Sequence, residues 1–326
     1  MIPPMHDDSD QAATASAPAG VGNIGVGFDL LGHVIDGPRD IARVRLLDQP
    51  VVRIERVAGD ARGVAEIPLD AQANTAGRGL IALRDALGLA HGFAVELEKG
   101  IPLGSGLGGS AASCVAALVA ANALLETPLP REALYPFALD GESVASDSRQ
   151  GDNVAPMLLG GVVLATADRM IRLSAPDWLH CVVVHPDQVL KTRRSRAVLA
   201  DPYPLREVTA HSAHLAQFLV GLQRGDAELI RAGLRDVLVE PRRAPLVPGF
   251  DRAKSAALDH GALGASLSGA GPATFAWFAS RAEAEAAAPA MRAGFADAGF
   301  QANAWVSPVA APGALLIEDP SAELSQ

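Results

Sequence analysis

The chain has 326 residues, of which 49% are hydrophobic and only 4% aromatic, and its formal net charge is −10 at pH 7. This length fits two domains or one large domain with a core built mostly from Ala, Val and Leu, and the acidic charge argues against nucleic-acid binding. No apolar run is long enough to span a membrane and nothing resembles a signal peptide, so we expect a cytoplasmic protein that binds neither nucleic acid nor membrane.

Hydrophobic periodicity predicts a mixture of helices and strands. In the first half we expect an extended segment over 44–57, a helix over 76–87, a strand over 93–98, helices over 110–125 and 131–146, and a loop over 151–161. In the second half we expect strands over 162–164 and within 177–186, helices over 207–223, 226–238 and 249–260, a strand-turn-strand unit over 265–279, a helix over 281–298 and a strand over 302–306.

This order does not repeat a βαβ unit, so the predicted fold class is α+β. We place a boundary near residue 160, between an N-terminal domain over 13–160 and a C-terminal domain over 161–317, and expect frayed ends over 1–12 and 318–326. Cys114 and Cys181 lie in apolar runs and are expected to be small buried side chains.

The most informative segment is the glycine-rich run over 101–113. Its glycines at 104, 106, 108 and 109 let the backbone come very close to a ligand. Ser110 then opens an apolar, alanine-rich helix, and its hydroxyl is expected to cap the first turn. The free amides and the dipole at such a helix start favour a phosphate. The segment therefore predicts binding of a nucleotide or another phosphate ester.

Two common phosphate-binding loops fit this segment poorly. A P-loop needs a lysine at its end, and none follows Gly109. The spacing Gly104-x-Gly106-x-x-Gly109 matches a dinucleotide-binding loop. However, the preceding strand alternates apolar and acidic residues, as a half-solvated strand does, whereas a Rossmann strand enters its first glycine as a buried apolar run. An NAD-dependent enzyme is thus a disfavoured alternative.

Three motifs in one order carry a resemblance to a known family. Residues 102–112 resemble the Pro-x-x-x-Gly-Leu-Gly-Ser-Ser-Ala-Ala loop of the GHMP kinases, with Gly109 in place of the first Ser. Segments 17–32 and 267–275 are similar to the first and third motifs of that family. The resemblance implies a two-domain GHMP kinase fold, with a ribosomal-protein-S5-like N-terminal domain and a ferredoxin-like C-terminal domain, and ATP-dependent phosphorylation of a small molecule.

Within that family the chain resembles the homoserine kinases. The matches are Asn23, Gly25, Gly27, Phe28, Asp29 and Gly32, the segment Gly151-Asp152-Asn153-Val154-Ala155-Pro156, and the regions 191–196, 240–243 and 247–250. The departures are Gly20 and Gly22, where the family usually has Ser and Ala, Ile24 in place of Leu, Gln150 where the family often has His, and Ala273 in place of Ser or Thr. The resemblance implies transfer of phosphate from ATP to the side-chain hydroxyl of L-homoserine in threonine biosynthesis, and a homodimer.

The resemblance also implies roles for individual residues. ATP would contact Asn74, at the adenine, and Pro102, Leu103, Gly104, Ser105, Gly106, Leu107, Gly108, Gly109, Ser110, Ala111 and Ala112. Mg²⁺ would be held by Ser110 and Glu142. The amino-acid substrate would contact Asn23, Asp29, Asn153, Thr192, Arg196 and Arg243, and the catalytic residues would be Asn153, Arg196 and Glu142.

Each of these residues also has an ordinary structural interpretation. Glu142 could lie on a solvated helix face, and Asp29 could cap a turn. Asn23 and Asn153 could stabilise loops, and any single arginine could lie on the surface. Arg242 adjoins Arg243 and could be confused with it. No general base stands out, and the role of Asp152 is left open. The alternatives are another small-molecule GHMP kinase, for an isoprenoid or a sugar, and a non-catalytic nucleotide-binding relative.

Overall fold

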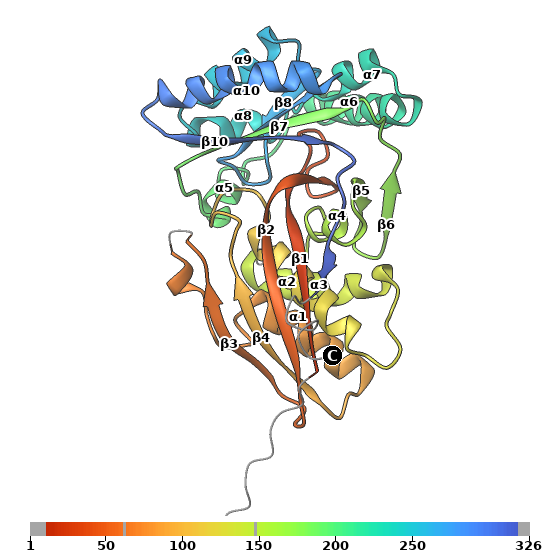
Figure 1. The fold of residues 1–326 in the computed structure, drawn as a ribbon. Helices are drawn as coiled ribbons and strands as arrows, with labels where there is room; N and C mark the ends of the chain where they lie inside the picture. Colours follow the sequence, from red (N-terminus) through yellow and green to blue (C-terminus); the bar gives the residue numbers. More distant parts are fainter. Residues whose placement is uncertain (1–10, 61–62, 147–148, 319–326) are drawn as a thin grey trace, which may run out of the picture.

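The structure is a computed structural model that describes residues 11–60, 63–146 and 149–318. Within these residues the strands form a seven-stranded sheet and a four-stranded sheet, which occupy the lower and upper halves of the molecule in Figure 1. The α+β class expected from the sequence is confirmed, because helices cover both sheets without a regular βαβ repeat.

The first sheet has the strand order β11-β1-β2-β4-β3, with β5 paired to β2 and β6 paired to β5. Only the β3–β4 pair is parallel among these described strands. The bounds are Ala12–Gly22 (β1), Leu31–Leu47 (β2), Val52–Ala58 (β3), Gly92–Glu98 (β4), Val162–Ala165 (β5), Met170–Leu173 (β6) and Leu315–Ile317 (β11).

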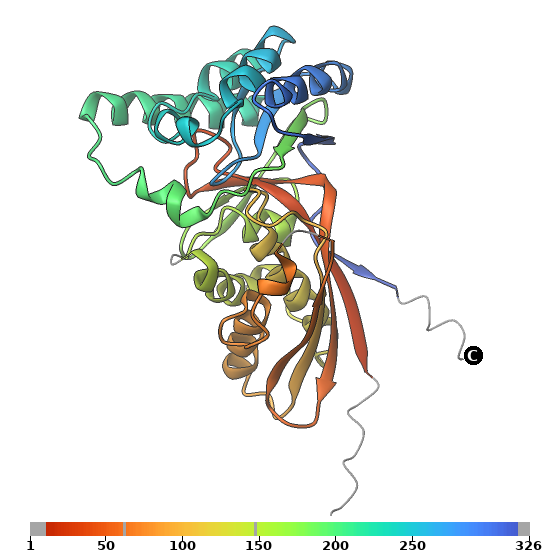
Figure 2. The ribbon, with the colours of Figure 1, turned by 90° about the vertical axis from the view of Figure 1, so that its left-hand side faces the viewer.

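Helices lie on one face of this sheet, and Figure 2 shows that they gather on one side of the long strands. They are α1 (Thr75–Leu87), α2 (Gly109–Ala123), α3 (Tyr135–Ser146) and α4 (Val154–Leu159), with short 3-10 helices at Val64–Glu66 and Arg131–Leu134. Every residue of α2 from Ala111 to Asn122 is buried, because small side chains let the helix pack closely on β1 and β2. The position of α2 fixes the glycine-rich segment that precedes it.

The second sheet has the order β10-β7-β9-β8, with every neighbouring pair antiparallel. Its strands are β7 (His180–Pro186), β8 (Gly264–Leu267), β9 (Thr274–Phe278) and β10 (Ala302–Pro308), and the accompanying helices are α5 (Thr192–Ala197), α6 (Leu205–Arg224), α7 (Ala227–Gly233), α8 (Glu240–Arg243), a 3-10 turn at Ala244–Leu246, α9 (Phe250–Asp259) and α10 (Arg281–Ala296). Helices α5 to α8 and the 3-10 turn are inserted between β7 and α9; apart from them, the order β7-α9-β8-β9-α10-β10 is a βαββαβ unit, which confirms the expected ferredoxin-like domain.

Alternating side chains of this second sheet enter two different cores. Val182 and Phe278 pack with Phe250 and Phe295 of α9 and α10. Val183, Phe275 and Trp277 instead join the core of the first sheet, together with Phe218 of α6. Strands with both faces covered are buried throughout, as β9 is. The two sheets therefore share a continuous core.

A buried polar contact also joins the sheets. Trp277 Nε1 lies 3.2 Å from His33 Nε2, and His33 Nδ1 lies 2.9 Å from the Val34 carbonyl. Burial lowers the pKa of His33 to about 4, so the ring is neutral near pH 7. The neutral ring donates from Nδ1 to the carbonyl and accepts the indole hydrogen at Nε2.

Several expected elements differ in detail from the structure. The single extended segment over 44–57 is the end of β2 and the whole of β3, joined by a turn, and β1, most of β2, β6, β11, α4, α5 and α8 were not predicted. The helix expected over 226–238 ends at Gly233. Just beyond it, the Asp236 carboxylate accepts hydrogen bonds from the amides of Leu238, Val239 and Glu240, which stabilises a turn in place of the helix.

The domain boundary near residue 160 stays a prediction. The strand pairing adds that β5, β6 and β11 follow that point in sequence and still hydrogen-bond within the first sheet. Most of the residues expected to fray lie outside the described ranges. Cys114 and Cys181 are free and buried, as expected.

Candidate active site

Most of the predicted site residues line one cavity of about 380 Å³. Those that do so are Asn23, Asp29, Asn74, Pro102, Leu103, Gly104, Ser105, Gly106, Gly108, Gly109, Ser110, Glu142, Asn153, Thr192, Arg196 and Arg243. Leu107, Ala111 and Ala112 are fully buried, so their side chains pack in the core and only their backbone can take part in binding.

The three glycine-containing motifs contact one another directly around this cavity. The Ser268 hydroxyl donates to the Gly106 carbonyl at 2.8 Å, and the Gly20 amide donates to the Leu107 carbonyl at 3.0 Å. Gly106 has φ +81°, and a Cβ there would lie 2.5 Å from the Ser268 carbonyl oxygen. Only glycine fits such a backbone position, so this close approach explains why the loop needs glycine there.

The glycine-rich segment leads directly into α2. Gly108, with φ +71°, is the N-cap residue, and no side chain caps the first turn. The expected cap by the Ser110 hydroxyl is wrong, because that hydroxyl donates to Glu142 Oε1 at 3.0 Å. The amides at the start of α2 therefore have no side-chain partner, as a phosphate site at a helix N-terminus requires.

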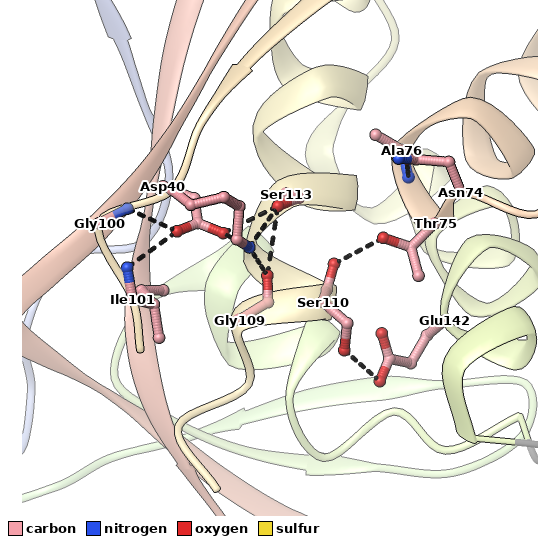
Figure 3. Close-up of polar contacts among 11 residues, drawn as sticks. Asp40, Asn74, Thr75, Ala76, Gly100, Ile101, Gly109, Ser110, Ser113 and Glu142 are labelled. Carbon is pink, nitrogen blue, oxygen red and sulfur yellow. Dashed lines mark hydrogen bonds and ion pairs between the residues drawn. The ribbon is translucent and has the colours of Figure 1, made fainter. Parts of the chain in front are cut away.

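Ser110 and Glu142 face each other across α2 and α3 (Figure 3). Glu142 is buried, which raises the pKa of its carboxyl to about 7, and the hydrogen bond from Ser110 partly offsets this. Among the described residues no group of three or more His, Cys, Asp or Glu could hold a metal. Mg²⁺ takes few protein oxygens and completes its shell with phosphate and water, so this hydroxyl–carboxylate pair fits that ion.

A charged pair lines the same cavity. Arg196 Nη1 and Nη2 donate to the two oxygens of Asp29 at 3.1 and 2.9 Å. Asn23 shapes this corner, because its Oδ1 accepts from the Asp29 amide at 2.9 Å and its Nδ2 donates to the Gly269 carbonyl at 3.0 Å. The Asn23 side chain is thus already engaged in the fold, and its contact with substrate stays a prediction.

The two adjacent arginines of α8 have different surroundings. Arg243 is 2% exposed, donates from Nη1 to the Gly269 carbonyl at 2.9 Å and lies 5.2 Å from the Phe28 ring centroid. Burial, helped by nearby Arg196, lowers the pKa of Arg243 to about 10. Arg242 instead stacks on Tyr203 and donates to the Pro202 carbonyl at 2.9 Å. Arg243, not Arg242, lines the cavity.

Asn153 and Asp152 lie at the start of α4, beside the charged pair. Asn153 Nδ2 donates to Asp152 Oδ1 at 3.4 Å, while its buried Oδ1 has no hydrogen-bond partner among the described residues. Burial, with a contribution from Asp29, raises the pKa of Asp152 to about 7. A Cβ at Gly22 would lie 2.6 Å from the Asp152 carboxylate, so the departure from the family's Ala at this position makes room for that side chain.

Asn74 is the N-cap of α1, a role that the sequence did not suggest. Its Oδ1 accepts from the amides of Ala76 and Gly77 at 3.0 and 3.4 Å, and its Nδ2 donates to the Pro68 carbonyl at 2.8 Å. The helix cap explains this side chain without a ligand, so its contact with adenine stays a prediction.

Two other departures from the family pattern are compatible with an intact loop. A Cβ at Gly109 would lie 3.3 Å from Ile101 Cγ2 and 3.6 Å from Lys99 Nζ. Ala273 lacks the usual hydroxyl, but its amide donates to the Ser105 carbonyl at 2.9 Å and so still braces the glycine loop.

The sequence did not point to a buried charged cluster under the glycine loop. Lys99 pairs with Asp40 of β2, and both contact Ser113 of α2. A lysine next to the end of a strand usually lies in solvent, so nothing in the local sequence indicated that Lys99 is buried. A larger groove of about 1550 Å³ lies beside the same segment, lined by residues such as Arg43, Glu96 and Arg292; of the predicted site residues it includes only Pro102 and Leu103.

Known proteins match this chain over nearly its whole length. The family descriptions "GHMP kinases N terminal domain" and "GHMP kinases C terminal" match residues 74–161 and 218–297. The homoserine kinase of Xanthomonas campestris pv. campestris (strain B100) is 57% identical over 305 residues, which are 94% of each chain. The chain belongs to the homoserine kinase family of the GHMP kinases.

Solved structures agree with this assignment. The crystal structure of homoserine kinase from Cytophaga hutchinsonii has a TM-score of 0.89 at 38% identity and covers 96% of this chain and 100% of that one. L. major mevalonate kinase in complex with R-mevalonate, at 18% identity and a TM-score of 0.64, covers 95% and 100% and shares the fold. The expected two-domain GHMP kinase fold is confirmed, and the dinucleotide-binding alternative is excluded. Among the described residues, no helix combines the length and apolarity needed to cross a bilayer.

Proposed function

We propose that this protein transfers the γ-phosphoryl group of ATP to the side-chain hydroxyl of L-homoserine, giving O-phospho-L-homoserine and ADP. The chain would thereby serve threonine biosynthesis, as its family membership implies. The observation that carries the proposal is the charged corner formed by Asp29, Arg196 and Arg243, which lines the same cavity as the glycine loop.

This corner suits a zwitterionic amino acid. Asp29 and Arg196 form an ion pair in the structure, and Arg243 adds a second positive charge to the same corner. The ammonium of a zwitterion can take Asp29 while its carboxylate takes Arg196 and Arg243 by charged hydrogen bonds. Each charge of the ligand then meets an opposite charge of the protein.

The glycine loop and α2 would receive the nucleotide. The first residues of α2 line the cavity, and the free amides and the dipole at this end of the helix favour phosphate. Ser110 and Glu142 would hold Mg²⁺, which when bound neutralises the charge on the transferring phosphoryl group. Glu142 would bind it as an ionised carboxylate, although burial alone favours its protonated form.

The acceptor hydroxyl would be oriented by Asn153 and Arg196. The unpartnered Oδ1 of Asn153 can accept the hydroxyl hydrogen bond, and Arg196 can donate to the same oxygen. We assign no side chain as general base; the proton passes to an oxygen of the transferring phosphate. Positioning and charge neutralisation account for most of the catalysis in such transfers.

The test is ADP release in the presence of ATP and Mg²⁺ with L-homoserine, L-threonine, L-serine or mevalonate. We expect a steep response to homoserine and a weak one to the others. Release with mevalonate and not with homoserine would assign the chain to another GHMP kinase activity, and ADP binding without any turnover would make it a non-catalytic relative. Light scattering on the purified protein tests the homodimer, which the family resemblance supports.

A further inference from the structure

Lys99 is buried beside the glycine loop and lines the active-site cavity, where the proposed chemistry does not use it. Its residue is 4% exposed. Its ammonium pairs with Asp40 and donates to the Gly109 carbonyl and to the Ser113 hydroxyl, each at 2.7 Å. The Gly109 carbonyl belongs to the first residue of α2, so Lys99 holds the point at which the loop becomes helix.

Asp40 holds the other end of the same loop. Its Oδ1 accepts from the amides of Gly100 and Ile101 at 3.1 and 3.0 Å, and Figure 3 shows these contacts beside those to the start of α2. Its Oδ2 accepts from the Ser113 hydroxyl at 2.8 Å. One buried ion pair, between Asp40 of β2 and Lys99 just after β4, thus ties the entry and the exit of the glycine loop together.

A buried ion pair is a poor means of gaining stability. Desolvation of two charges offsets most of their attraction, and well-packed apolar residues often stabilise a fold as well. An apolar pair could not, however, donate to the Gly109 carbonyl and accept from the amides of Gly100 and Ile101 at once. The contacts with backbone groups are what this pair adds.

We propose that Lys99 and Asp40 are positioning residues that fix the separation and direction of the two ends of the glycine loop, so that its amides are preorganised for the nucleotide phosphates. Neither residue needs to touch the nucleotide. The proposal rests on the proposed use of ATP. If the wild-type protein fails to bind ADP, the proposed function fails, whereas wild-type binding that these variants leave intact overturns only the positioning role.

The experiment compares Lys99→Met with the double variant Lys99→Met/Asp40→Asn. The single change leaves the buried Asp40 carboxylate without its counter-ion and should lower the melting temperature markedly. In the double variant the Asn amide oxygen can still accept from Gly100 and Ile101, and its NH₂ can donate to Ser113. We expect a melting temperature much closer to wild type, but about tenfold weaker binding of a fluorescent ADP analogue, as loss of one charged hydrogen bond implies, and a raised KM for ATP.

Two further variants make the outcome decisive. Lys254→Met breaks the partly buried Lys254–Glu240 pair, away from the loop, and should cost stability without changing ADP affinity. Ser113→Ala keeps both charges and their backbone contacts but removes the hydrogen bonds of the Ser113 hydroxyl with Lys99 and Asp40, so it should fold and weaken ADP binding by up to about tenfold, as loss of a hydrogen bond to a charged group implies. A folded double variant with wild-type ADP affinity overturns the proposal. If the double variant does not fold, Asp40→Asn alone decides, because it keeps an acceptor for the Gly100 and Ile101 amides and removes the ion pair with Lys99; wild-type ADP affinity in it would overturn the proposal.

Discussion

Arg242 and Arg243 are adjacent in sequence but serve different parts of the protein, and this difference can be measured. Arg243→Ala removes a buried guanidinium from the cavity. A charged hydrogen-bond pair contributes on the order of 1.5–3 kcal/mol, so homoserine affinity should fall about tenfold to a hundredfold, with little change in the KM for ATP. Arg242→Ala is the matched control and should change homoserine affinity only slightly. Strong damage in Arg242→Ala with a silent Arg243→Ala would shift the assignment by one residue.

Ser110→Ala and Glu142→Gln test the proposed metal pair. Each change removes an oxygen ligand or a charge beside the reacting phosphate, so turnover should fall by more than about tenfold while the circular dichroism spectrum stays native. Steady-state rates over a range of Mg²⁺ concentrations make the comparison. Wild-type turnover in a natively folded Glu142→Gln protein contradicts the metal role.

Asp152 should make stability depend on pH in a definite direction. Burial raises the pKa of this carboxyl to about 7 from its ordinary 3.8. The folded protein therefore binds more protons than the unfolded chain between these values, and the contribution of Asp152 to stability declines as pH rises from about 4 to about 7. Melting temperatures across this range should vary less in Asp152→Asn. An unchanged slope would mean that Asp152 is already ionised in the folded protein.

At the scale of elements, the glycine loop should tolerate a side chain at one glycine and not at another. Gly106 has φ +81° and its Cβ would meet a carbonyl at 2.5 Å, so Gly106→Ala combines left-handed strain of about 1–2 kcal/mol with a clash. It should lower both the melting temperature and ADP affinity. Gly109 has helical geometry and its nearest contact would be 3.3 Å. Gly109→Ala should leave both nearly unchanged, and equal damage in the two variants would contradict this view of the loop.

The sequence predicted the elements with a strong local signal and missed those that depend on the rest of the fold. The strand at 93–98 has alternating side chains and the helix at 76–87 has an apolar face, and the structure has both elements. β1 consists largely of Ala, Gly and Pro, which have low strand propensity, and it is a strand because β2 and β11 pair with it. Because α2 is buried on all sides, its sequence shows no helical alternation of apolar and polar residues. Its many alanines nevertheless predicted a helix.

The site shows the same division. The glycine pattern alone indicated a phosphate, but the roles of Glu142, Arg196 and Arg243 came only from family resemblance, since nothing local distinguishes them from surface residues. The structure brings all three to the cavity. The Lys99–Asp40 pair could not be predicted, because Asp40 lies on β2, Lys99 follows β4, and only the fold buries them together. The predicted helix cap by Ser110 is wrong because its hydroxyl donates to Glu142, which is distant in sequence.

At the scale of the molecule, the active-site cavity depends on both sheets. The first sheet carries the glycine loop and α2, while the loop after β8 and helices α5 and α8 bring Gly269, Arg196 and Arg243 to its edge. The shared core around Trp277 and His33 fixes one part against the other. The amino-acid part of the proposed site thus combines residues from near the start of the chain, such as Asp29, with Arg196 and Arg243 from α5 and α8.

The most direct test of this account is the identity of the product. The protein is incubated with ATP, Mg²⁺ and L-homoserine, and the mixture is followed by phosphorus NMR and mass spectrometry. The account predicts that O-phospho-L-homoserine and ADP appear in equal amounts, and that neither forms when homoserine is omitted. Formation of ADP with inorganic phosphate alone, or no reaction with homoserine by a folded protein that binds ATP, would contradict it.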